Sequence, residues 1–383
     1  MNRKLRMGMI GGGPGAFIGT VHRMAAALDQ QIELVCGVFS SDPGKSTKAG
    51  TELGLPPERV YGSYKEMLRR ESELPFSQKM EIVSIVTPNH LHFEPAKLAL
   101  ENGFHVIMDK PLTLDLEEAH ELKKIHDASG KLFCLTYTYA GYPMIKEARQ
   151  QVADGKLGKI RKVLAEYTQG WLYNTQEHSG NKQAEWRTDP TRSGVAGATG
   201  DIGTHAFHLA EYITGLEVTS ILAELQRTIE GRKLDDDATV ILRFNNGATG
   251  ALIATQVATG EENDLRIRVY GEKAGLEWTH RDPNTLIIRL PGEPDQYFRA
   301  GNDYLGTLAR HNTRTPAGHP EGFIEAFANH YRNFTFCIRA QMNNEEARDE
   351  WKDFPGMNEG VRGMAFVEAS VKSAGKWVEL DLT

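Results

Sequence analysis

The sequence has few cysteines and no long apolar run. Its three cysteines, Cys36, Cys134 and Cys337, are widely spaced and form no CxxC pair. Two of them lie in apolar, strand-like runs, so buried thiols in a reducing cytoplasm are the expected state. The apolar runs fall well short of the roughly 20 residues that span a bilayer. Glycines interrupt the start "MNRKLRMGMIGGG", which predicts a first strand rather than a secretory signal, and we expect a cytoplasmic protein without membrane association.

The sequence also lacks an excess of positive charge and the common metal-binding motifs. Its 44 Lys and Arg against 51 Asp and Glu give a formal net charge of −7, whereas general nucleic-acid binders concentrate cations to neutralise phosphates. Its 13 histidines form neither H-E-x-x-H nor H-x-x-E-H. We therefore expect no nucleic-acid partner and no metal. The length of 383 residues predicts two domains.

Short apolar runs alternate with helical patterns through the first third of the chain. The runs are continuous, as is typical of strands that are buried on both faces of a sheet. Strands that alternate with helices imply right-handed crossovers and a parallel sheet, so we expect an α/β fold. The expected strands lie at residues 5–11, 32–39, 81–87, 105–108 and 131–137, and the expected helices at residues 18–29, 45–53, 94–103 and 116–130.

A glycine-rich turn, "GGGPGA", stands between the first strand and the first helix. Gly11, Gly13 and Ala16 match the G-x-G-x-x-G/A pattern, in which they permit a tight turn, the approach of a pyrophosphate and close helix–strand packing, respectively. The N-terminus of the following helix offers free N–H groups to the phosphates. This placement predicts a dinucleotide-binding Rossmann domain. The residues expected at the phosphates are Gly11, Gly13, Pro14, Gly15 and Ala16.

The end of the second strand bears on the choice of dinucleotide. An acid at this position contacts the ribose hydroxyls of NAD, and here the segment "VFSSDPGKS" offers Asp42. Alternatively, Ser40, Ser41 and Lys45 hold the 2′-phosphate of NADP, or Asp42 simply caps the next helix. NAD is the expected cofactor, and NADP stays open.

Two further segments follow strands of the same sheet, "TPNHLH" and "MDKPLT". Ligands of open α/β sheets bind outside the carboxyl ends of the strands, so both segments are expected to face the cofactor. Pro111 disfavours a helix at Lys110 and holds that residue in an extended turn. The residues expected at the cofactor from these segments are Thr87, Pro88, Asn89, His92, Asp109 and Lys110.

The segment "GDIGTHAFHLAEYITG", residues 200–215, has the pattern of an amphipathic helix. Its apolar stripe is flanked by a second stripe in which an acid and two imidazoles replace the usual lysines and glutamates. Because side chains four apart are neighbours on a helix, Asp201 and His205 are expected to approach each other. Asp201 is equally well explained as an N-cap. The second stripe contains Asp201, His205, His208 and Tyr212.

Taken together, these motifs resemble the Gfo/Idh/MocA oxidoreductases, which include glucose–fructose oxidoreductase and inositol dehydrogenase. The glycine-rich turn, "TPNHLH", "DKP" and "GDIGTH" occur in that family's order, and "WRTDPTRSG" and "GMAFVEASVKSAGKWVEL" extend the resemblance over nearly the whole chain. It implies that Lys110, Asp201 and His205 form the catalytic group. Asp109 replaces the family's usual Glu, and His208 stands where many members have Asp.

The pattern changes after Tyr137, and we expect domains at residues 1–137 and 138–383. Closely spaced strands predict an α+β domain with an open, mostly antiparallel sheet, against which the helix from Gly203 packs. Its "NNG" is a hairpin turn. The resemblance implies that the outer face of this sheet joins subunits, so a homodimer or homotetramer is expected. The expected strands lie at residues 160–168, 220–226, 238–244, 249–257, 265–270 and 285–290.

The function that the resemblance implies is oxidation of a secondary hydroxyl of a sugar, glycoside or cyclic polyol, with hydride transfer to NAD(P). His205 takes the proton, because an imidazole titrates near the working pH, and Lys110 assists. The three groups are expected to meet at a cleft between the domains. The alternative is an NAD-dependent glycoside hydrolase that oxidises its sugar transiently, eliminates the aglycone, adds water and reduces the sugar again. Candidate substrate contacts are Tyr139, Trp186, Arg187, His208 and His319, several of them on two long polar segments expected to be loops.

Overall fold

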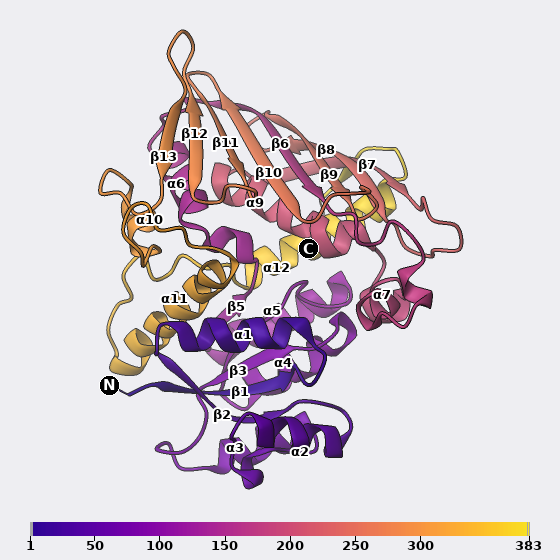
Figure 1. Cartoon of the computed structure of the whole chain (residues 1–383), viewed down its shortest axis with the longest axis vertical. Coiled ribbons are helices and arrows are strands. Elements are labelled where there is room, and N and C mark those ends of the chain that lie inside the picture. Colours follow the sequence, from indigo (N-terminus) through magenta and orange to yellow (C-terminus); the bar gives the residue numbers. More distant parts are fainter. Residues whose placement is uncertain (1–2, 381, 383) are drawn as a thin grey trace. The chain divides into compact units, whose positions relative to one another are not determined.

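The structure is a computed structural model that describes residues 3–380 and 382, and these residues form two compact units (Figure 1). The first unit consists of the chain up to Thr113 together with Glu117–Thr138 and Phe327–Gly360. The second consists of Leu114–Leu116, Tyr139–Ala326 and the chain from Val361 onward. A segment from late in the sequence thus belongs to the first unit, and the domain boundary after residue 137 stays a prediction.

In the described part of the chain, the first unit contains a five-stranded parallel sheet of order β2-β1-β3-β4-β5. The strand order reverses at β1, which pairs with both β2 and β3, and ligands of such sheets bind at this switch point. All the strands predicted in this third of the chain are present, and the parallel sheet is confirmed. Their bounds are β1 (Leu5–Gly11), β2 (Ile32–Val38), β3 (Ile82–Val86), β4 (His105–Met108) and β5 (Phe133–Leu135).

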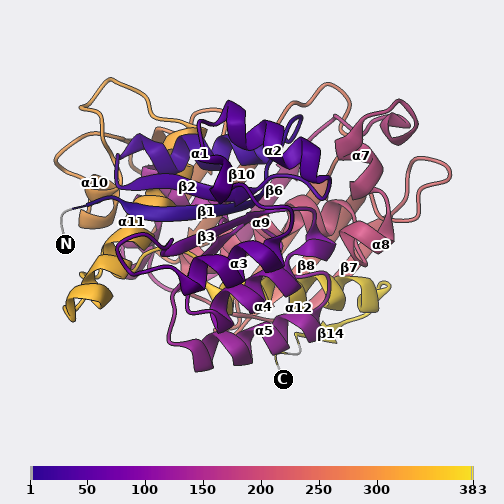
Figure 2. The same ribbon diagram turned by 90° about the horizontal axis from the view of Figure 1, so that it is seen from below.

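Helices cover both faces of this sheet, as Figure 2 shows for α1 on one face and α4 and α5 on the other. The sequence pattern missed α3, because only Met67, Leu68 and Glu71 of its ten residues are buried and the rest are polar. The elements are α1 (Phe17–Leu28), α2 (Pro43–Glu52), η1 (Pro57–Arg59), α3 (Tyr64–Glu73), η2 (Asn89–Leu91), α4 (Phe93–Glu101), α5 (Leu116–Ser129), η3 (Thr138–Gly141), which continues into the second unit, and α11 (Phe323–Asn343), which enters from it.

The second unit contains, among the described residues, a nine-stranded sheet of order β13-β12-β11-β10-β6-β9-β8-β7-β14. It is antiparallel except between β6 and β9, which confirms the mostly antiparallel prediction. The "NNG" hairpin joins β8 to β9, with Gly247 at φ 87°. The bounds are β6 (Ile160–Thr168), β7 (Val218–Gln226), β8 (Asp237–Phe244), β9 (Thr249–Thr255), β10 (Asp264–Gly271), β11 (Gly275–Thr279), β12 (Thr285–Arg289), β13 (Gln296–Arg299) and β14 (Val378–Glu379).

One face of this second sheet is covered by helices, while the other is not (Figure 1). Along β8, alternate side chains are buried and the residues between them are at least partly exposed, which is the period of a strand with one covered face. On the covered side, the rings of Phe207 and Phe366 stack with centroids 4.5 Å apart. The covering helices are α6 (Pro143–Ala153), α9 (Thr204–Thr214) and α12 (Met357–Ser373).

The two long polar segments expected to be loops, residues 174–186 and 301–322, contain short helices, so that expectation is wrong for these parts of them. Asn181 accepts hydrogen bonds from two backbone N–H groups at the start of α7, and just beyond this segment Asp189 accepts one from the N–H of Thr191 at the start of α8. These capping residues were the sequence signal for the helices. The elements are η4 (Gln176–His178), α7 (Lys182–Arg187), α8 (Pro190–Ser193) and α10 (Thr307–His311).

Candidate active site

The glycine-rich turn after β1 leaves no room for side chains at two of its positions. A Cβ on Gly13 would lie 2.2 Å from the carbonyl oxygen of Phe39, and Gly11 has a φ of 91°. The close helix–strand packing assigned to Ala16 lies at Gly19 instead, where a Cβ would lie 2.3 Å from the Cα of Gly12. The turn is longer than the motif assumed, so the closely packed glycine comes three residues later.

The N-terminus of α1 fits the pyrophosphate of a dinucleotide. The helix begins after Ala16 with no side-chain cap and no acid in its first turn. Its first N–H groups thus remain for an anion, which the helix dipole also favours. Pro14 and Gly15 are exposed, and nothing lies within 4 Å of the Cβ position of Gly15. The residues present therefore fit a dinucleotide.

At the end of β2, Asp42 is the N-cap of α2. Its Oδ1 accepts a hydrogen bond of 3.1 Å from the backbone N–H of Lys45. The Oγ of Ser40 accepts one of 3.1 Å from the N–H of Asp42, and Ser41 and the Lys45 side chain are exposed. The capping interpretation of Asp42 is confirmed. Contacts of these residues with a ribose or a 2′-phosphate stay predictions.

The segments after β3 and β4 are joined by a buried histidine. The ring nitrogens of His92 lie 2.7 Å from the carbonyl oxygen of Pro111 and 2.9 Å from that of Thr87. Burial lowers the pKa of His92. The ring therefore links the backbone after β3 to the turn after β4 that carries Lys110, whose peptide bond to Pro111 is cis. The roles of Thr87, Pro88, Asn89 and His92 at the cofactor stay predictions.

Asp109 lies in a hydrogen-bonded network of the first unit. Its Oδ1 accepts a 3.1 Å hydrogen bond from Thr136 and lies 4.0 Å from Nε2 of His22. Nδ1 of His22 lies 2.7 Å from the hydroxyl of Tyr331. Burial alone would raise the pKa of Asp109, but the neighbouring His22 and the charge of Lys110 lower it to about 2. The sequence analysis missed His22 and Tyr331, because nothing in their spacing connects α1 to α11.

In the second unit, Asp201 lies in a π-helical turn, η5 (Thr199–Gly203), that precedes α9. The expected continuous α-helix from residue 200 is therefore wrong in its first turn. The capping interpretation of Asp201 is wrong as well, because α9 begins after Gly203 without a side-chain cap. Oδ2 of Asp201 instead accepts hydrogen bonds from Nε of Arg187, at 3.1 Å, and from Nε2 of Gln256, at 2.8 Å.

Arg187 lies between Asp201 and two indole rings. Its guanidinium carbon is 4.2 Å from the ring centroid of Trp186 and 6.0 Å from that of Trp171. An arginine in this setting gains both a charge-assisted hydrogen bond and cation–π attraction. The expected role of Trp186 and Arg187 in gripping substrate stays a prediction, but the charge of Arg187 is already balanced by a carboxylate.

His205 is buried on α9, with 7% of its surface exposed, and faces two tyrosines. Its ring centroid lies 5.0 Å from that of Tyr139 and 6.1 Å from that of Tyr167. The two phenol oxygens are 2.5 Å apart, and both bond to the side chain of Asn263. Burial raises the pKa of both tyrosines. The imidazole therefore lies next to a hydrogen-bonded cluster of neutral hydroxyl and amide groups, which includes Tyr139, Tyr167 and Asn263.

The sequence did not predict three amide side chains of this hydrogen-bonded cluster. Gln169 follows β6, Gln256 follows β9 and Asn263 precedes β10, and these strands are neighbours in the sheet. Gln169 donates to Oδ1 of Asn263 at 2.7 Å and accepts from the indole N–H of Trp171 at 3.0 Å. An amide at the same end of adjacent strands was the available signal, but strand order is not visible in the sequence.

The remaining substrate candidates have different surroundings. His208 is buried, and its ring stacks on Tyr212 with centroids 5.7 Å apart. His319 is exposed, with Nδ1 3.3 Å from the carbonyl oxygen of Ala317 in its own loop. Their substrate contacts stay predictions.

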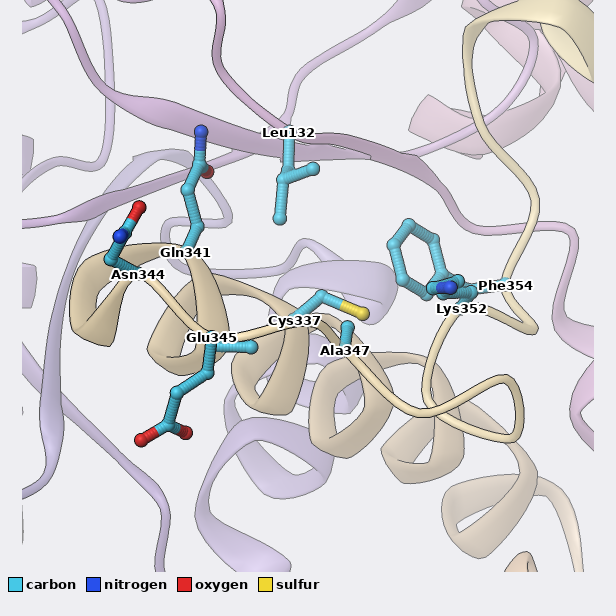
Figure 3. A pocket seen from close by; sticks show the side chains of 9 residues that line it. Leu132, Cys337, Gln341, Asn344, Glu345, Ala347, Lys352 and Phe354 are labelled. Atoms are coloured by element: carbon cyan, nitrogen blue, oxygen red, sulfur yellow. The ribbon is translucent and has the colours of Figure 1, made fainter.

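The first unit also contains a cavity of about 540 Å³ (Figure 3). Its wall includes Leu132, Cys337 and Phe354, and none of the expected site residues lines it. Within residues 3–380 and 382, no three His, Cys, Asp or Glu side chains form a metal-binding group. Over the same residues, every helix is too short or too polar to cross a membrane.

Each of the two units contains a region that matches a known protein-family domain. Residues 5–137 match the "Oxidoreductase family, NAD-binding Rossmann fold", and residues 145–277 match the "GFO/IDH/MocA C-terminal domain". The chain is 33% identical to the uncharacterized oxidoreductase YfiI of Bacillus subtilis over 99% of this chain and 98% of that protein. It is 26% identical to levoglucosan dehydrogenase of Pseudarthrobacter phenanthrenivorans, again over 99% and 98%.

The structure is also similar to that of an inositol dehydrogenase homolog from Azotobacter vinelandii. The complex of that protein with NAD+ matches with a TM-score of 0.94 and 35% identity over 99% of this chain and 98% of that chain. Its complex with NADH and myo-inositol matches with a TM-score of 0.90 and the same identity and coverage. The expected fold, family and NAD cofactor are thus confirmed. The chain belongs to the Gfo/Idh/MocA family of oxidoreductases and contains that family's NAD-binding Rossmann domain.

Proposed function

We propose that this oxidoreductase oxidises a secondary hydroxyl of a sugar, glycoside or cyclic polyol, with His205 as the general base and Asp201 and Lys110 as its partners. The observation that carries the proposal is the setting of Asp201 and His205. Asp201 lies in the π-helical turn and His205 lies on the helix that follows it. The side chains of Arg187 and Gln256 hold the carboxylate of Asp201. A buried imidazole with a fixed carboxylate on the same helical segment is suited to take up a proton.

In this proposal, each of the chain's groups has a separate role. When bound, the nicotinamide accepts a hydride from the carbinol carbon. His205 takes the hydroxyl proton, because an imidazole is the side chain whose ordinary pKa lies near neutral pH. Asp201 orients the ring and stabilises its protonated form, while Lys110 stabilises negative charge on the substrate oxygen. Lys110 lies in the first unit and His205 in the second.

The lining of the second unit supports an uncharged, polyhydroxylated substrate. Tyr139, Gln169 and Asn263 offer hydroxyl and amide groups, which donate to and accept from sugar hydroxyls. The charge of Arg187 is compensated by Asp201, so Arg187 is not a free cation for a phosphate or carboxylate group. The names of the relatives, an inositol dehydrogenase homolog and levoglucosan dehydrogenase, agree with a neutral cyclic substrate.

We also propose that the uncovered face of the second sheet forms a homodimer or homotetramer. Leu222, Ile241, Ala251 and Leu164 are register partners on adjacent strands and form an apolar row, each half-buried in the single chain. Such rows on an uncovered sheet face are typical of subunit interfaces. Light scattering on the purified protein measures the oligomeric state, and a monomer at micromolar concentration would contradict the proposal.

A screen of inositols, sugars and aryl glycosides with NAD+ and NADP+ tests the function. Reduced cofactor should accumulate with at least one neutral polyol, whereas aglycone release without net reduction would assign the chain to the hydrolase alternative. His205→Ala should lower kcat by about 10²- to 10⁴-fold and leave the Kd for NAD+ unchanged. His126→Ala, on α5, is the control and should retain the wild-type kcat. Full turnover by His205→Ala would refute the assignment of the base.

A further inference from the structure

Asp235 is a buried carboxylate that binds the segment leading into the catalytic turn. It lies just before β8, with 7% of its surface exposed. Its Oδ1 accepts a 2.6 Å hydrogen bond from the N–H of Gly197, and its Oδ2 accepts bonds of 2.8 and 2.7 Å from the N–H and the hydroxyl of Thr199. An ionised carboxylate accepts hydrogen bonds only, so its surroundings of three donors suit it.

The backbone of Asp235 binds the same segment. Its carbonyl oxygen accepts a 2.9 Å hydrogen bond from the N–H of Ala198. A Cβ on Gly197 would lie 2.1 Å from that oxygen, so only glycine permits this approach. Residues 197–199 are therefore bound to Asp235 at every position.

The bound segment is the beginning of the π-helical turn that holds Asp201. The N–H of Asp201 donates to the carbonyl of Gly197 at 2.9 Å. Asp235 thus fixes the backbone from which the turn of Asp201 begins.

We propose that Asp235 is a positioning residue for Asp201 and His205, acting through the backbone of residues 197–199. It touches neither substrate nor cofactor in this proposal. The effects on kcat that follow from this positioning role rest on the function proposed above. Because a misplacement of about 1 Å at a reacting group costs on the order of 10²-fold in rate, loss of this anchor should reduce kcat strongly.

Asp235→Asn is the test and Asp236→Asn is the matched control. An asparagine offers a carbonyl oxygen and an NH2 group, so the backbone N–H of either Gly197 or Thr199 would face an N–H group. The side chain of Asp236 is equally buried and accepts hydrogen bonds from Thr228, Ile229 and Arg232, which lie in the β7–β8 connection. Asp235→Asn should lower kcat by about 10- to 100-fold without changing the Kd for NAD+. Asp236→Asn should retain the wild-type kcat.

Thr199→Val, which removes one of the three hydrogen bonds, serves if Asp235→Asn does not fold. It should lower kcat less and should shift the pH dependence of kcat, which a loss of stability alone would not do. Wild-type kcat and pH dependence in both Asp235→Asn and Thr199→Val would overturn the proposal. A loss of kcat in Asp236→Asn as large as that in Asp235→Asn would overturn it as well.

Amide hydrogen exchange separates this proposal from the proposed function. Faster exchange at residues 197–203 in Asp235→Asn, but not in Asp236→Asn, would support the anchor even if no polyol is oxidised by the wild type. In that case the function fails and the positioning role stands. Equal exchange in the two variants would overturn the positioning role, whatever the substrate.

Discussion

Replacing Arg187 by alanine tests whether Asp201 is held in place by the residues that the structure puts around it. The Nε–Oδ2 distance is 3.1 Å, and the two side chains are 23% and 15% exposed. The pair is therefore shielded from most of the solvent screening that makes surface ion pairs weak. In the variant, Asp201 would keep the 2.8 Å hydrogen bond from Gln256 but lose its positive partner.

The magnitude follows from the hydrogen bond that is lost. A hydrogen bond to a charged group contributes about 1.5–3 kcal/mol, and each 1.4 kcal/mol of transition-state stabilisation is about tenfold in rate. If all of it supports the orientation of Asp201, kcat should fall by about 10- to 100-fold. We expect the lower part of this range, because Gln256 remains.

Steady-state kinetics on the substrate found in the screen distinguish two roles for Arg187. If Arg187 only binds substrate, its removal raises KM and leaves kcat unchanged. If Arg187 holds Asp201 in place, its removal lowers kcat. Combining Arg187→Ala with Asp201→Asn should cost no more than Asp201→Asn alone, because the two residues act as a unit. Arg192→Ala, on α8, is the control. Wild-type kcat in Arg187→Ala, or full additivity with Asp201→Asn, would refute the reasoning.

Two further predictions concern the stability of the first unit. Gly19→Ala should lower the free energy of unfolding by about 1–3 kcal/mol, because the new methyl group would lie 2.3 Å from the Cα of Gly12; an unchanged midpoint in denaturant would contradict this. Asp109 has a pKa lowered from 3.8 to about 2, so its ionised form stabilises the fold above its unfolded pKa, and this contribution is lost as the pH falls through about 2. The difference in unfolding free energy between wild type and Asp109→Asn should therefore be largest near neutral pH and shrink between about pH 4 and pH 2, and a constant difference would count against the network with His22.

The local patterns of the sequence predicted the elements well where many apolar residues recur at one period. Continuous runs predicted β1 to β5, and closely spaced strand-like segments predicted β6 and β8. Short elements with few buried residues were missed, among them α3, α7 and β11, because their stability comes from caps and from neighbours that are distant in the sequence. The motif "GDIGTH" predicted the helix but not its π-helical first turn, which follows residues bound by Asp235.

The sequence by itself determined the kind of protein, because the order of strands and helices, the glycine-rich turn and the positions of Lys110, Asp201 and His205 are all readable along the chain. Only the tertiary structure decided how these groups are held. Arg187, Gln256 and Asp235 reach the turn of Asp201 from three other segments. Hydrogen bonds between such segments depend on strand order and chain reversals, which leave no periodic pattern in the residues themselves.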